Sequence, residues 1–236
     1  MMVLGFLLLL TVIFLVILLN RPSSKKEDAS YTESRKKETS EKLLAYLENK
    51  YQEEFEIIDV GLKNATSSEN YDWVIAKAKN SSEEFRAYVI DENEMSDEYY
   101  ALLIKDSLAQ KLKAAIDNHF SAIVVDAQMY RSFDQRFDQN LSLEDALLLM
   151  KQENKSFGIN ATIYVSDSGL TEESFQEKVK EIETIFRNEM WSGIYAVYHV
   201  TIPIDEGTPK EELQKIPTNK DLYDFREVFN IHFETS

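Results

Sequence analysis

The chain has 236 residues, a formal net charge of −16, 44% hydrophobic and 29% charged residues, and no cysteine. This composition is typical of a globular protein and excludes a largely disordered one. The acidic balance disfavours nucleic-acid binding, because the phosphates would be repelled. The lack of cysteine excludes disulfides, thiolate nucleophiles, thiolate-bound zinc and a lipid-modified cysteine.

The first segment is hydrophobic. Val3 to Leu19 carries no charged residue, and as a helix it would span about 26 Å, close to the thickness of the hydrocarbon core. A cleavable signal peptide is the alternative, but the apolar run is longer than usual for one and no basic residue precedes it. We therefore predict a transmembrane anchor over residues 1–20, with the lipid bilayer as its partner through residues 3–19.

The next segment, residues 21–40, holds six basic and four acidic residues and shows no apolar periodicity. It is interpreted as a polar tether. Arg21, Lys25 and Lys26 follow the hydrophobic segment, and by the positive-inside rule they favour a cytoplasmic body. Long domains can override that rule, so the basic cluster alone leaves the orientation open.

Residues 41–120 are predicted to form an α-β-β-β-α domain. A helix over 41–51 is followed by three strands with a period of two, near 54–62, 71–79 and 84–91, and then by a helix over 97–119. The strands are expected to form an antiparallel sheet with both helices on one face. Trp73 on the middle strand is expected to be buried, and residues 91–98 are interpreted as a solvated acidic loop.

Residues 121–236 are predicted to be a second α+β region. Strands are expected near 122–125, 159–165, 194–202 and 228–233. Ser142 and Thr171 are predicted helix N-caps, and residues 208–211 read as a capping box with proline at the first helical position. The predicted fold class is therefore α+β: an N-terminal transmembrane helix followed by helices packed on a mainly antiparallel sheet.

No pattern in the body predicts catalysis. The three histidines are far apart, the six glycines are isolated, and no serine-nucleophile turn occurs. The 42 acidic residues are too many for any carboxylate pair to be diagnostic. No catalytic, cofactor-binding or metal-binding residue is predicted, and the body is expected to fold without a metal or an organic cofactor.

One segment, residues 132–138, is unusual because two phenylalanines lie four residues apart among charged residues. Phe133, Arg136 and Phe137 are the candidate contacts for a partner protein, with the rings as aromatic anchors. The alternative is a packed connection that covers the end of a sheet.

Three stretches of the first region carry a resemblance: KYQEEFEI at 50–57, FRAYV at 85–89 and SDEYY at 96–100. They resemble a group of uncharacterised exported or membrane-anchored proteins of Gram-positive bacteria with a cystatin-like α-β-β-β-α region. The resemblance covers residues 40–120 and implies location and layout, with no activity. Gln52 stands where that group has glycine, which puts the shape of that turn in question.

Two functional hypotheses follow. The first is a membrane-anchored, extracytoplasmic binding or accessory protein, with another envelope protein as a possible partner and no nucleic acid. The second is a cell-envelope hydrolase that uses paired carboxylates. The expected location is the cell membrane, with a single span and the body outside the cytoplasm. The resemblance carries most of the choice of orientation.

Overall fold

The computed structural model describes residues 24–63, 70–153, 155, 158–189, 191–205 and 207–232. The fold is α+β. These residues form two four-stranded sheets, and among their strand pairs only β6–β7 is parallel. In chain order the elements are α2 (Ser24–Tyr51), β1 (Phe55–Gly61), β2 (Asp72–Ala78), β3 (Phe85–Val89), β4 (Met95–Asp97), α3 (Tyr99–Leu103), α4 (Lys105–Ile116), β5 (Ala122–Met129), α5 (Leu143–Gln152), β6 (Ile159–Ser166), α6 (Glu172–Asn188), β7 (Gly193–Val200), α7 (Lys210–Leu213), two short 3₁₀ turns (Ile216–Thr218 and Lys220–Leu222) and β8 (Tyr223–Ile231).

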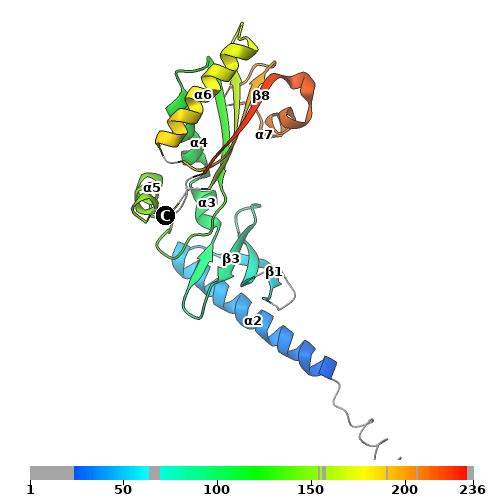
Figure 1. Ribbon diagram of the computed structural model, residues 1–236. Coiled ribbons are helices and arrows are strands. Elements are labelled where there is room, and N and C mark those ends of the chain that lie inside the picture. The colour runs from blue at the N-terminus through cyan, green and yellow to red at the C-terminus, as the bar shows by residue number, and fades with distance from the viewer. Residues whose placement is uncertain are drawn as a thin grey trace, which may run out of the picture.

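The N-lobe consists of α2 and the antiparallel sheet β1-β2-β3-β4. Figure 1 shows α2 lying against this sheet and extending beyond it. Leu43 and Leu47 of the helix are fully buried in one core with Val74 and Ala87 of the strands. The predicted packing of helix 41–51 on three antiparallel strands is confirmed, and β2 lies inside the sheet as its apolar faces indicated. The second predicted helix was expected on the same face, but its longer part, α4, packs on β5 of the other sheet.

Helix α2 starts earlier than the sequence predicted. It is continuous from Ser24, so most of the predicted tether is helical. Lys, Glu and Arg are good helix formers, and a polar helix needs no apolar stripe when other contacts hold it. Arg35 forms a bidentate ion pair with Asp72 (2.7 and 2.9 Å), and Thr39 is buried against the sheet. These contacts fix the helix well before residue 41.

Two residues of the N-lobe, Trp73 and Gln52, bear on what the sequence predicted. Trp73 is half-buried on the sheet face away from α2, where its ring covers Gly61 and lies 5.0 Å from the guanidinium of Arg86. The expected deep burial is therefore wrong, because β2 turns its smaller residues toward the helix. Gln52, which follows α2, has φ of 53°, the left-handed conformation that glycine favours.

The connection between the lobes also departs from the prediction. The acidic loop contains the short strand β4, which pairs with β3. The predicted helix over 97–119 is two helices, α3 and α4, separated at Ile104. A three-residue strand is too short to show a period of two, so no pattern of residues predicted it.

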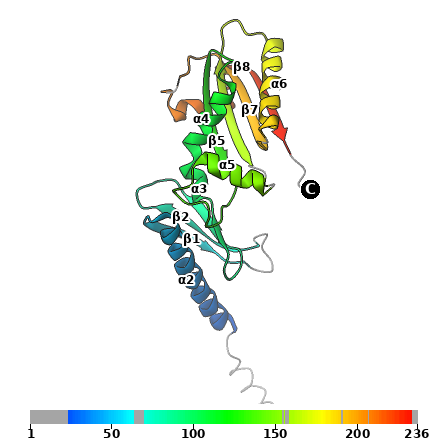
Figure 2. The same ribbon diagram turned by 90° about the vertical axis from the view of Figure 1, so that its left-hand side faces the viewer.

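The C-lobe is built on the sheet β5-β6-β7-β8. Strands β6 and β7 are parallel and joined by α6, while β5 and β8 flank them in antiparallel pairs. Figure 2 shows α4 and α6 over one face of this sheet, and Figure 1 shows α7 on the opposite side. The predicted N-caps Ser142 and Thr171 are confirmed. One continuous hydrophobic core runs through both lobes, from Leu43 to Ile231.

The predicted capping box at 208–211 is not formed. Helix α7 begins at Lys210 with Pro209 as its N-cap, and no side chain caps it. The hydroxyl of Thr208 instead accepts a hydrogen bond from the backbone N–H of Asp205 (2.9 Å). The threonine is thus held in a turn before the helix, which shifts the start of the helix by one residue.

Among the described residues, no helix combines the length and hydropathy needed to cross a membrane. The predicted anchor at residues 3–19 lies outside the described residues.

Candidate functional site

The segment singled out in the sequence is part of the core. Phe133 and Phe137 are 2% and 4% exposed, and both rings contact Tyr100. The backbone of Phe133 forms a β-bridge with Asp97, which extends the edge of the N-lobe sheet. The two rings are therefore unavailable as surface anchors in this fold, and the packed connection is the interpretation that their burial supports.

Arg136, the third member of that segment, is partly exposed and forms ion pairs with Asp134 and with Glu153 at the end of α5. The arginine holds the pKa of Asp134 below its usual range, chiefly by hydrogen bonding. It also lowers the pKa of Glu153 to about 2, together with Lys155. Arg136 thus ties the segment to α5, and its charge is already neutralised by two carboxylates.

A buried polar network lies where α2, β4 and this segment meet. Lys50 Nζ is 2.6 Å from Asp97 Oδ2, and the two side chains are 2% and 0% exposed. The hydroxyls of Tyr46 and Tyr51 donate to the same carboxylate at 2.9 and 2.7 Å, and Lys50 also donates to the carbonyl of Phe133 at 3.2 Å. These hydrogen bonds compensate the burial of two charges, and the network has no access to a substrate.

Burial shifts the pKa values of the groups in this network. Burial raises the pKa of Tyr46 and Tyr51 well above their usual range, and the Asp97 carboxylate adds to this effect. Burial also lowers the pKa of Lys50, while Asp97 acts in the opposite direction. The phenols therefore remain protonated donors at neutral pH, as the observed hydrogen bonds require.

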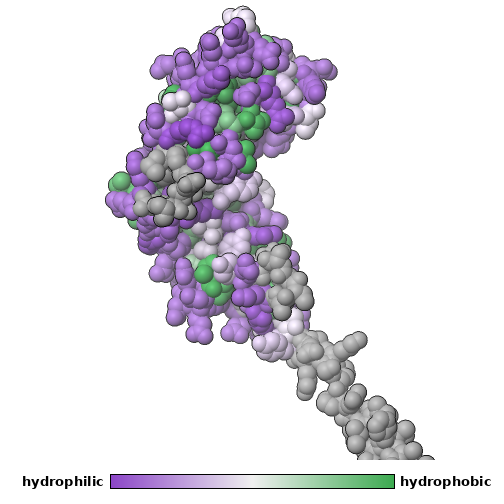
Figure 3. Space-filling view, viewed as in Figure 1, coloured by the Kyte–Doolittle hydropathy of each residue, from purple (hydrophilic) through white to green (hydrophobic). Residues whose placement is uncertain are grey.

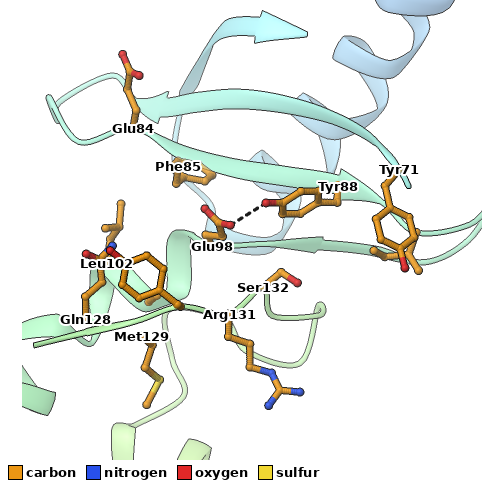
Figure 4. Close-up of a pocket in the computed structure, with 13 residues that line it drawn as sticks. Tyr71, Glu84, Phe85, Tyr88, Glu98, Leu102, Gln128, Met129, Arg131 and Ser132 are labelled. Atoms are coloured by element: carbon orange, nitrogen blue, oxygen red, sulfur yellow. Dashed lines mark hydrogen bonds between the residues drawn. The ribbon is translucent and has the colours of Figure 1, made fainter. Parts of the chain in front are cut away.

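One cleft that does reach the surface lies between β3 and residues 128–132, with a volume of about 350 Å³. In Figure 4, Tyr88 and Glu98 meet in the middle, Ser132 lies across from Tyr88, Gln128 and Leu102 lie at one end, and Tyr71 lies at the other. The Tyr88 hydroxyl donates to Glu98 Oε1 at 2.8 Å. Burial and this carboxylate raise the pKa of Tyr88 to about 12, which keeps it neutral.

The second cleft, of about 410 Å³, lies on the face of the C-lobe sheet that α4 and α6 leave open, beside α7. Its floor includes a row of three neighbouring side chains: Gln128 of β5 pairs with Asn160 of β6, which pairs with Ile194 of β7. At its rim, Lys210 of α7 lies 3.5 Å from Asp126.

The two clefts share Gln128 and Tyr130, and together we call them the interlobe groove. Figure 3 shows the outline of the molecule indented between the lobes, on the side of α7. Three of the large hydrophobic side chains exposed in the described part of the chain line the groove: Tyr130 (65% exposed), Ile194 (48%) and Tyr71 (40%). Exposed apolar groups gathered around polar ones are typical of a binding surface.

The histidines lie apart from the groove. His199 is buried in the C-lobe with Nε2 3.0 Å from the carbonyl of Asp167, and His119 lies 3.2 Å from Glu181. Across the described part of the chain, no group of three or more potential ligands is arranged to hold a metal ion.

Sequence reasoning missed the groove because its lining comes from widely separated elements. Gln128 and Tyr130 fall after Val125, where the predicted strand ended, whereas β5 continues to Met129. The alternation of Asp126, Gln128 and Tyr130 was a usable signal that the strand continues with a polar face.

Comparisons with protein-family models, with curated proteins and with solved structures found no match for this chain.

Proposed function

We propose that this chain is a membrane-anchored, extracytoplasmic binding protein whose ligand site is the interlobe groove. The observation that carries the proposal is the gathering of Tyr71, Tyr130 and Ile194, all exposed, around the polar side chains of two adjoining clefts. The combined volume is in the range of small-molecule and oligomer sites. The uncharged run at residues 3–19 supports the anchor.

The hydrolase alternative gains no support from the groove. Its carboxylates are Glu84, Glu98 and Asp126. Asp126 faces Lys210, and Glu98 accepts hydrogen bonds from the Tyr88 hydroxyl and the backbone N–H of Arg86. Each of these two carboxylates already has a partner within the protein, so neither supports a role as a free acid or base.

Photo-crosslinking in intact cells tests whether the groove binds a ligand. A benzophenone amino acid placed at Tyr130 reacts with C–H bonds of sugars, lipids and proteins alike. We expect a covalent adduct from position 130 and none from Leu148, an exposed side chain on α5 outside the groove. Equal labelling at the two positions, or no adduct at position 130, contradicts the binding proposal.

Protease treatment of intact protoplasts tests the orientation separately. An extracytoplasmic body is digested before lysis, whereas a cytoplasmic body is protected until the membrane is opened. N-terminal sequencing of the mature protein tests the anchor, which requires that the chain is not cleaved after Asn20.

A further inference from the structure

Apart from Glu84, the charged groups that line the interlobe groove have partners within the protein. Lys210 pairs with Asp126, Lys105 pairs with Glu83, and Glu98 is held by Tyr88. Five of the neutral polar side chains that line the groove, in contrast, make no hydrogen bond within the described part of the chain; they are Tyr71, Gln128, Tyr130, Ser132 and Asn160. A charged ligand would compete with existing ion pairs, whereas an uncharged polar ligand finds donors and acceptors that are free.

The floor of the second cleft offers side chains in a regular row. Gln128, Asn160 and Ile194 stand on three adjacent strands, and adjacent strands are about 4.8 Å apart. Two amides can thus bind hydroxyl groups of neighbouring units in a chain-like ligand, because each amide offers both donors and an acceptor. The exposed face of Tyr130 at the junction of the clefts suits the C–H face of a sugar ring, since aromatic faces carry partial negative charge.

A peptide fits this floor less well. Peptides that bind to sheets commonly add a strand to an unpaired edge. Strands β6 and β7, which carry Asn160 and Ile194, are paired on both sides, so the floor presents side chains instead of free backbone groups.

We propose that the interlobe groove binds an uncharged oligosaccharide, with the ring of Tyr130 stacked on one sugar and the amides of Gln128 and Asn160 bonded to its neighbours. This inference rests on the proposed function, because it names the ligand class of the same groove.

Binding of defined trisaccharides to the full-length protein in lipid nanodiscs tests the proposal. The neutral probes are maltotriose, cellotriose and N,N′,N″-triacetylchitotriose, measured by saturation-transfer NMR and calorimetry. We expect at least one of them to bind, and trigalacturonate, an anionic analogue, to bind more weakly. Tyr130→Ala and Asn160→Ala should each weaken the affinity about tenfold, which corresponds to roughly 1.4 kcal/mol.

Tyr31→Ala is the matched control, because Tyr31 is also an exposed tyrosine but lies on α2, away from the groove. It should leave the affinity unchanged. The saccharide proposal is overturned if no neutral trisaccharide binds, if the groove variants bind as tightly as the parent protein, or if an uncharged serine–glycine peptide binds in their place. Crosslinking at position 130 without sugar in the adduct would also overturn it, while leaving the binding function intact.

Discussion

Two polar clusters of this protein differ in their exposure to solvent and in their hydrogen-bond partners. The network of Lys50, Asp97, Tyr46 and Tyr51 is closed to solvent and its groups bond to one another. The interlobe groove is open, and five of its neutral side chains, Gln128 and Asn160 among them, have no protein partner in the described residues. In this protein, the most strongly shifted pKa values belong to the buried structural network. The candidate site is marked instead by side chains whose hydrogen-bonding groups have no protein partner.

The largest expected effect is on the buried network. Asp97→Ala leaves the Lys50 ammonium buried without its counter-charge and should lower the free energy of unfolding by about 3–5 kcal/mol. Urea unfolding of the full chain, followed by circular dichroism, measures this loss. Asp126→Ala is the control, because its exposed partner Lys210 can be solvated; it should cost less than about 1 kcal/mol. Equal effects of the two substitutions would remove the distinction between the clusters.

Alkaline pH should also act on the buried network. Tyr46 and Tyr51 have pKa values raised in the folded protein above the ordinary value of about 10. Their contribution to stability is therefore complete below about pH 10 and is lost as the pH rises toward the folded values. Burial lowers the pKa of Lys50, so this residue changes the stability in the opposite direction as the pH rises. It is one group, however, against two tyrosines. We expect the part of the phenolate absorbance that Tyr46→Phe and Tyr51→Phe remove from the spectrum to appear together with the loss of circular dichroism. Phenolate formation at Tyr46 or Tyr51 in the folded protein would contradict the burial argument.

Arg136 provides an intermediate case, because its ion pairs are partly exposed. Arg136→Ala should lower the free energy of unfolding by at most about 1 kcal/mol, and the difference should shrink in high salt. The pKa of Asp134, which the arginine lowers, should return toward its usual value, so the stability that Asp134 adds above that value decreases. Carboxyl chemical shifts followed by NMR report this change, and an unaltered Asp134 titration would show that the arginine is not its cause.

The smallest effect is expected in the groove. Gln128→Ala and Asn160→Ala remove no hydrogen bond within the described residues, so each should change the free energy of unfolding by less than about 0.5 kcal/mol. The urea measurement used for Asp97→Ala applies. A loss above about 1 kcal/mol would mean that these amides serve the fold, and would weaken their assignment to a ligand site.

Local signals in the sequence predicted the local structure well. Thr171 predicted the start of α6, and the buried stripe of Phe175, Val179 and Phe186 is as expected for its spacing. The order of helix and strands in the N-lobe was also predictable. The start of α2 was not, because a polar helix has no apolar period, and its ordering depends on Arg35 reaching Asp72, 37 positions later.

The groove and the buried network were beyond sequence reasoning for the same reason. Lys50 and Asp97 are 47 positions apart, and Gln128 and Asn160 meet only through the pairing of β5 with β6. Nothing in the local pattern around a lysine or an asparagine reports such contacts. Phe133 and Phe137 show the converse, because charged neighbours left a surface role open for two residues that are buried in the core.

Helix α2 acts as a lever arm. Its 28 residues make a rod about 42 Å long, whereas a flexible chain of that length would sample end-to-end distances of about 30 Å in all directions. Arg35 and Lys50 clamp the rod to the sheet at two heights, so the body cannot pivot freely about it. A tilt of the N-terminal end of α2 therefore moves the groove along an arc. One rigid element sets both the distance and the direction of the groove from that end (Figure 1).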